Sequence, residues 1–174
     1  MEIRRNIVSA ARIVLAVYIA VILFMMFFAF DRSSLDASGG FRYSFAVTGI
    51  PLWLPKKFSV LWIFSMGNLL AFVPFGFLLP AAFPKVLRPY WKAGAVFLAC
   101  IAALECAQML THLGSFDIED ILVNFLGFSI GFASWKISLR VPEMWRKACV
   151  YIGCVCLFSL VLLIAAEGFN QILR

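Results

Sequence analysis

Charged residues are scarce in this chain, and long polar stretches are missing. Only 14% of its 174 residues are charged whereas 64% are apolar, and it has nine acidic residues and a single histidine. No stretch between the apolar runs is longer than about 30 residues, which is too short for an independent soluble core. The composition excludes an ordinary soluble domain and predicts one polytopic membrane domain over residues 1–174.

The net charge of +6 does not point to nucleic acid, because no basic face is interleaved with aromatic residues. The Lys and Arg residues gather at the ends of apolar runs, as the positive-inside rule describes for membrane proteins. The five cysteines all fall inside apolar runs, so we interpret them as small apolar side chains rather than as disulfides or metal ligands.

The chain has five runs that are long and apolar enough to cross a bilayer, since roughly 20 helical residues span the hydrocarbon. We therefore predict an all-α polytopic bundle of about five transmembrane helices. Lys and Arg are about twice as frequent on the cytoplasmic side if the N-terminus is cytoplasmic and the C-terminus extracytoplasmic, which favours that orientation. The predicted spans cover residues 13–30, 60–83, 93–113, 118–139 and 148–166.

The longest segment between spans covers residues 31–58. Its first half is rich in Ser and Gly and is expected to form a flexible loop. Its second half places Trp53 between Pro51 and Pro55, a composition that suits the membrane interface.

The stretch ECAQMLTHLGSFDIEDILVNFLG, from Glu105 to Gly127, carries four of the nine acidic residues in an apolar neighbourhood. A carboxylate inside a span is costly, so it indicates a functional site. Helix periodicity and depth predict a polar pocket between the second, third and fourth spans, open to the outer side. The expected ligand-binding residues are Asn68, Glu105, Gln108, Asp117, Asp120 and Asn124.

Most of these residues also have a purely structural interpretation. Asp117 can cap the fourth span with Asp120 at its third position, and Gln108 and Asn124 can hydrogen-bond between helices. His112, in a turn, fits a solvated loop residue. Glu105 is harder to explain structurally, because the spans offer it no cationic partner. The residues expected to shape helix packing are Pro74, Gly76, Gly127 and Gly131.

The segments NLLAFVPFGFLLP (68–80), ECAQ (105–108) and SFDIEDILVNFLG (115–127) resemble the VanZ-like membrane proteins. The resemblance implies a multi-pass protein of the bacterial cytoplasmic (inner) membrane, with a role in the cell envelope and in reduced susceptibility to teicoplanin. Family members commonly carry an arginine before Ser-Phe-Asp, where this chain has Gly114. The matching positions are Asn68, Pro74, Gly76, Glu105, Gln108, Asp117, Asp120, Asn124 and Gly127.

Three functions fit these observations. The favoured one is an accessory protein that binds a membrane lipid, a lipid-linked cell-wall precursor or a lipoglycopeptide, without a cofactor. The second is an enzyme acting on a lipid-linked precursor or glycolipid, with Glu105 as acid/base and Asp117 and Asp120 as metal ligands or a second carboxylate. It would need a divalent cation, because the predicted pocket has no Lys or Arg to bind phosphate. The third is a proton-coupled transporter, which the lack of an internal repeat disfavours.

Overall fold

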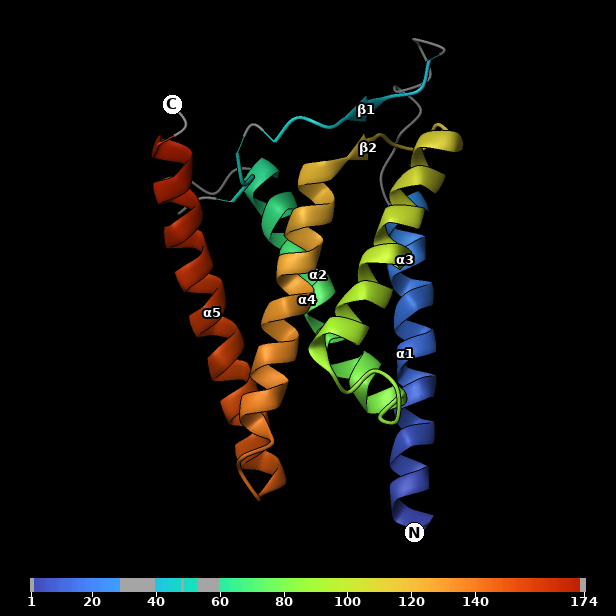
Figure 1. The fold of residues 1–174 in the computed structure, drawn as a ribbon, viewed down its shortest axis with the longest axis vertical. Helices are drawn as coiled ribbons and strands as arrows, with labels where there is room; N and C mark the ends of the chain where they lie inside the picture. The colour runs from blue at the N-terminus through green and yellow to red at the C-terminus, as the bar shows by residue number, and fades with distance from the viewer. Residues whose placement is uncertain (1, 29–39, 48, 53–59, 173–174) are drawn as a thin grey trace. The chain divides into compact units, whose positions relative to one another are not determined.

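The computed structural model describes residues 2–28, 40–47, 49–52 and 60–172. Within these ranges, five helices are long and apolar enough to cross a membrane. Residues 31–39 of the expected flexible loop and residues 53–59 of the expected interfacial segment lie outside the described residues. The described end of the loop contains a short strand, Tyr43–Ser44, instead of only flexible loop. The helices, shown in Figure 1, are α1 (Glu2–Phe28), α2 (Val60–Ala82), α3 (Tyr90–Leu110), α4 (Ile118–Ser138) and α5 (Met144–Ile172).

Each helix contains most of the apolar run that predicted it, and the differences lie at the helix ends. α1 begins well before its predicted span of 13–30, and α5 extends past both ends of its predicted span of 148–166. α3 ends at Leu110, earlier than expected. The Thr111 N–H makes the last bond of the α-helical pattern, to the Ala107 carbonyl, whereas the His112 N–H donates to Met109, only three residues back. His112 then adopts a positive φ of 57°, a conformation that commonly terminates a helix.

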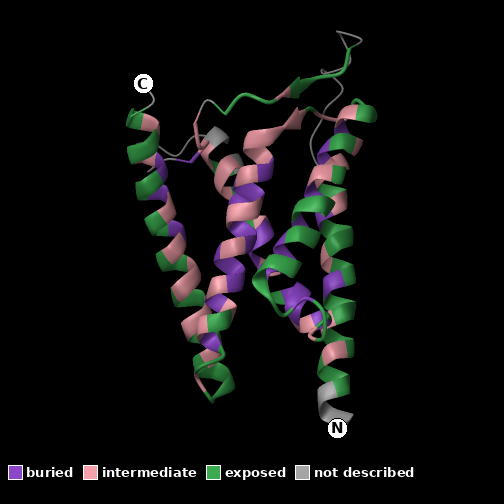
Figure 2. Ribbon diagram, viewed as in Figure 1, coloured by how far each residue is buried: buried purple, intermediate pink, exposed green. Residues whose placement is uncertain are grey.

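The helices differ in how much of their apolar surface is covered. In the most apolar part of α4, 56% of the residues are buried, against 11% in α1 and in α5. Figure 2 shows the contrast, with buried residues frequent along α4 and exposed residues dominating α1 and α5. Exposed apolar side chains over most of a long helix suit contact with hydrocarbon rather than water.

The chain divides into two compact units, and the expected single domain stays a prediction. The first unit comprises Met1–Ala46 and Leu78–Ile121. It contains α1, α3, the last turn of α2 and the start of α4. It also contains two short strands, β1 (Tyr43–Ser44) and β2 (Phe116–Asp117), which pair in parallel. Figure 1 shows β1 lying along β2.

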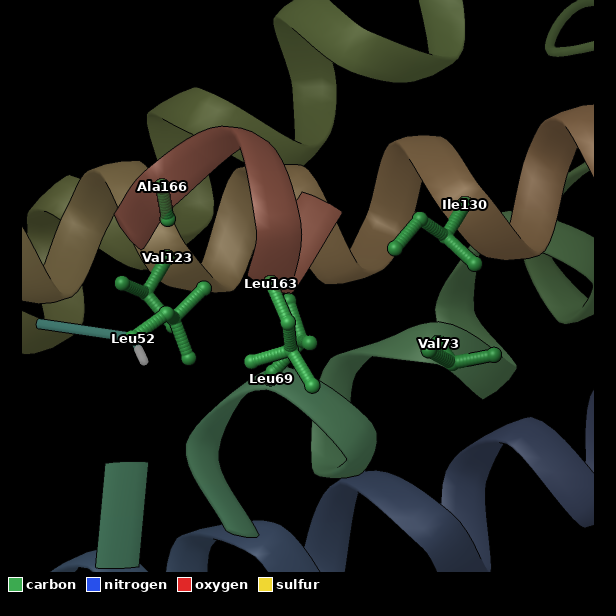
Figure 3. Packing of buried hydrophobic residues seen from close by; sticks show 7 residues of the cluster. All are labelled: Leu52, Leu69, Val73, Val123, Ile130, Leu163 and Ala166. Atoms are coloured by element: carbon green, nitrogen blue, oxygen red, sulfur yellow. The ribbon is translucent and has the colours of Figure 1, made fainter. Parts of the chain in front are cut away.

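The second unit comprises Val47–Phe77 and Leu122–Arg174 and contains most of α2, most of α4, and α5. Its buried core brings side chains from all three helices together with Leu52, which precedes α2. Figure 3 shows this cluster, which consists of Leu52, Leu69, Val73, Val123, Ile130, Leu163 and Ala166.

The segment before α2 is tied to the end of α5 by Asn170. The Asn170 side-chain oxygen accepts a hydrogen bond from the Ile50 N–H at 2.9 Å. Its amide nitrogen donates to the carbonyls of Ile50 at 2.7 Å and Leu52 at 3.4 Å. One side chain thus satisfies a backbone donor and two acceptors that lie about 120 positions away in the sequence.

Three glycines lie where α2 and α4 meet within the second unit. A Cβ added at Gly127 would overlap the Leu69 carbonyl oxygen, and one at Gly131 would overlap the Val73 carbonyl oxygen. Gly76 is the counterpart on α2, because its added Cβ would overlap backbone atoms around Phe128. The two backbones therefore touch directly, as in the small-residue contacts of membrane helices.

Candidate functional site

The packed side of α3 ends in two polar residues. Glu105 and Gln108 are only 3% and 5% exposed. They continue the buried side of α3, which Figure 2 shows in purple and which consists of Ala93, Gly94, Phe97, Ile101, Glu105 and Gln108. A carboxyl and an amide thus occupy positions where α3 otherwise buries small or apolar side chains.

Gln108 is held by α1. Its side-chain nitrogen donates a hydrogen bond of 2.9 Å to the backbone carbonyl of Met26. Met26 is in the last turn of α1, where carbonyl groups lack partners within the helix. Gln108 therefore links α3 to the end of α1, as the interhelical interpretation describes. The sequence analysis assigned the pocket to the second, third and fourth spans and did not include this α1 carbonyl.

Asp117 begins α4. Its Oδ1 accepts a hydrogen bond of 2.9 Å from the Glu119 N–H, so Asp117 is the N-cap and Asp120 is the third residue of the helix. Both carboxylates lie at the positive end of the helix dipole, where negative charge is stabilised. Capping does not prevent Asp117 from contacting a ligand, because a carboxylate has further acceptor positions.

Two substitutions at Asp117 separate its capping role from its charge. We expect Asp117→Ala to destabilise the protein by about 1 kcal/mol, whereas Asp117→Asn retains the cap and most of the stability. SDS-titration unfolding of the purified protein, followed by circular dichroism, measures both. Equal losses in the two variants would show that the cap contributes little. If the Asp117→Asn protein is stable but fails to bind a ligand that the unmodified protein binds, the negative charge of Asp117 is needed for ligand binding.

The sequence analysis missed an aromatic patch in the first unit, next to Asp117 and the start of α4. It comprises Phe41, Tyr43, Phe45 and Phe116. The rings of Phe45 and Phe116 lie 5.3 Å apart, and those of Tyr43 and Phe45 lie 5.5 Å apart. Phe41, Tyr43 and Phe45 are 57%, 64% and 68% exposed. The alternation of aromatic and polar residues in FRYSF is the local signal that could have predicted a strand here.

The ladder between β1 and β2 also brings a basic residue to the turn between α3 and α4. The Phe116 N–H donates a hydrogen bond of 2.9 Å to the Arg42 carbonyl, so the backbone of Arg42 lies beside the residue preceding Asp117. The turn itself, from Thr111 to Phe116, contains no Lys or Arg. His112 is exposed in this turn and stacks on Phe41 with ring centroids 5.4 Å apart.

The two remaining predicted site residues lie in the second unit. Asn68 is exposed on α2, although Leu69 beside it is fully buried. Asn124 is 2% exposed on α4, and its side-chain oxygen has no hydrogen-bond partner among the described residues. A buried acceptor without a donor is costly, so this position is suited to a donor from a ligand or a trapped water. The pocket shared by all six residues stays a prediction.

No three or more His, Cys, Asp and Glu side chains gather closely enough to hold a metal ion within the described part of the chain. All five cysteines are free, and four of them are exposed. A divalent cation at Asp117 and Asp120 therefore remains a prediction tied to the enzyme alternative.

Comparison with known proteins gives one result. A family model described as VanZ/LLP1 matches residues 15–139, which include α1 from its buried Leu15, α2, α3 and α4. Neither the curated proteins nor the solved structures gave a significant match.

Proposed function

Because the chain belongs to the VanZ/LLP1 family, we propose that it is a multi-pass protein of the bacterial cytoplasmic membrane that binds a lipophilic or lipid-linked ligand from the outer leaflet. Lipoglycopeptide antibiotics and lipid-linked cell-wall precursors are the two ligand classes. Binding a lipoglycopeptide would lower susceptibility to it by keeping it from its target. The proposed ligand carries both an apolar chain and a polar head.

Glu105 is the observation that carries this proposal. Its side chain is 3% exposed on a helix long and apolar enough to cross a membrane. It lies five residues before the end of α3, roughly 8 Å below that end. Burying an ionisable group in an apolar medium is costly, so a carboxyl at this depth favours a functional role. We propose that Glu105 binds the polar head of the ligand.

The aromatic patch supports an amphiphilic ligand. Its exposed rings lie on β1 and directly beside it, and β1 pairs with β2 directly before α4. Aromatic side chains favour the boundary between lipid and water and offer apolar area to an acyl chain. The backbone of Arg42 lies beside Phe116, so we assign Arg42 as the basic residue that serves this turn, where Gly114 stands in place of the arginine that the family resemblance implies.

Substitutions at Glu105 test the proposal. The probes are a lipoglycopeptide and the same glycopeptide core without its acyl chain, titrated against the full chain in nanodiscs. Glu105→Gln keeps the shape and hydrogen bonding, so we expect its Kd for the lipoglycopeptide to stay within about threefold of the unmodified protein. Glu105→Leu removes both carboxyl oxygens, and we expect binding to weaken at least about tenfold. Glu119→Gln, at the same end of the first unit, is the control.

Each contrary result has a definite meaning. Unchanged binding by Glu105→Leu would show that Glu105 is not part of the site. Equal binding of both probes would show that the protein does not recognise the acyl chain. If Glu105→Gln abolishes resistance in cells while binding persists, the protein is an enzyme or a proton carrier instead. Dependence on a divalent cation then identifies the enzyme, and dependence on the proton gradient identifies the carrier.

A further inference from the structure

The other end of α1 forms a basic groove with the turn that follows α2. The groove has a volume of about 560 Å³ and lies wholly within the first unit. Its positive charges are Arg5, Arg12 and Lys85, and its apolar walls include Val8, Phe83 and Val86. None of the lining residues whose side chains the structure describes is acidic. This combination of clustered cations and apolar walls was not part of the sequence analysis.

Arg12 is oriented by two contacts at the end of α2. Its Nε donates a hydrogen bond of 3.1 Å to the carbonyl of Ala82, the last residue of that helix. Its guanidinium carbon lies 5.4 Å from the centre of the Phe83 ring. A guanidinium has five N–H donors, so the terminal amino groups of Arg12 keep the capacity to bind a further acceptor.

The side chains that the structure describes, which begin at Arg5 in α1, do not neutralise the positive charges of the groove. None of their carboxylates forms an ion pair with Arg5, Arg12 or Lys85. Three close cations repel one another in a partly apolar setting, so an anion that joins them is stabilised by all three. Guanidinium and ammonium groups bind phosphate oxygens through short, charge-assisted hydrogen bonds.

The position of the groove indicates which phosphate is available. Arg5 and Met26 are roughly 30 Å apart along α1 at about 1.5 Å per residue, which is close to the thickness of the hydrocarbon layer. If Met26 lies at one boundary of the hydrocarbon layer, Arg5 therefore lies at the opposite boundary, at the level of lipid headgroups. Val86 and Phe83 are exposed at the groove, where they can contact an acyl chain.

We propose that this groove binds the phosphate group of an anionic phospholipid, with Arg5, Arg12 and Lys85 on the phosphate and the apolar walls on the glycerol and acyl region. Basic pockets between membrane helices commonly take such headgroups. Zwitterionic lipids are disfavoured because their ammonium group meets three cations. This site is separate from the proposed outer ligand site, and either can exist without the other.

Native mass spectrometry tests this site. It measures lipid binding to the delipidated full chain in non-ionic detergent. Phosphatidylglycerol is compared with phosphatidylcholine of the same acyl chains. We expect phosphatidylglycerol to bind at least about tenfold more tightly, and Arg5→Gln/Lys85→Gln to reduce that preference to about twofold. The matched control, Arg140→Gln/Lys147→Gln, removes the same charge from the segment around the start of α5 and should keep the preference. Both double variants retain the bond from Arg12 to Ala82.

Several results would overturn the proposal. Equal loss in both double variants would mean that lipid preference follows net charge alone, and no loss in Arg5→Gln/Lys85→Gln would mean that the groove is not the site. Displacement of phosphatidylglycerol by millimolar inorganic phosphate would identify a soluble anion as the ligand. If the first double variant does not fold, Lys85→Gln alone, on the exposed turn, should reduce the preference about threefold.

Discussion

Leucine in place of Gly131 should strongly destabilise the second unit. The Cβ of any residue at this position overlaps the Val73 carbonyl oxygen, and backbone atoms cannot rotate away as a side chain can. α2 and α4 would have to separate, which also opens the core around Val123 and Ile130. We expect the free energy of unfolding to fall by about 3 kcal/mol, near the upper end for overpacked sites. SDS titration of the purified protein, followed by circular dichroism, measures it.

Gly153 and Gly67 provide the controls for this experiment. An added Cβ at either glycine meets nothing within 4 Å, and each glycine lies in a helix of the same unit. Gly153→Leu and Gly67→Leu should therefore unfold at the SDS concentration of the unmodified protein or above it, because leucine has a higher helix propensity than glycine. If Gly131→Leu unfolds together with Gly153→Leu, the direct backbone contact between α2 and α4 is wrong.

The second large effect is expected at Asn170. Asn170→Leu removes three hydrogen bonds at once and leaves the Ile50 N–H and the Leu52 carbonyl facing an apolar side chain, whereas the Ile50 carbonyl still accepts from the Leu52 N–H. We expect a loss of about 2 kcal/mol in the free energy of unfolding, since partly buried backbone groups without partners are costly. The same SDS titration applies.

Two further variants sharpen this test. Gln171→Leu changes the exposed neighbour in the same helix and should have little effect. Asn170→Asp keeps the acceptor for the Ile50 N–H but replaces the donor, so its stability should fall between the two leucine variants. Equal stability of Asn170→Leu and Gln171→Leu would contradict the proposed role of Asn170.

The helices could be predicted from the sequence because each depends on a local property. A run of apolar residues predicts a span whatever surrounds it, and the Gly127 and Gly131 spacing predicts a helix contact. The sequence also predicted that Glu105 and Gln108 share one side of α3, because helix periodicity relates residues three apart. These inferences need no information about which segments meet.

The features that could not be predicted depend on contacts between distant segments. Nothing near Gln108 indicates that its partner is the Met26 carbonyl, 82 positions earlier, because every backbone carbonyl has the same chemistry. Asn170 was treated as part of a short tail after a span ending at 166. α5 instead continues to Ile172, since a helix need not end where its apolar run ends. The alternation in FRYSF indicates a strand, but nothing near it indicates that the strand pairs with Phe116–Asp117.

α5 has 29 residues whereas α4 has 21, so their lengths are roughly 43 Å and 32 Å at about 1.5 Å per residue. A hydrocarbon layer of about 30 Å matches α4 but not α5, which must tilt or project into the headgroup region. Asn170 lies two residues before the C-terminal end of α5. If that end projects, a thinner bilayer is expected to expose its hydrogen bonds to water and to loosen the attachment of α5.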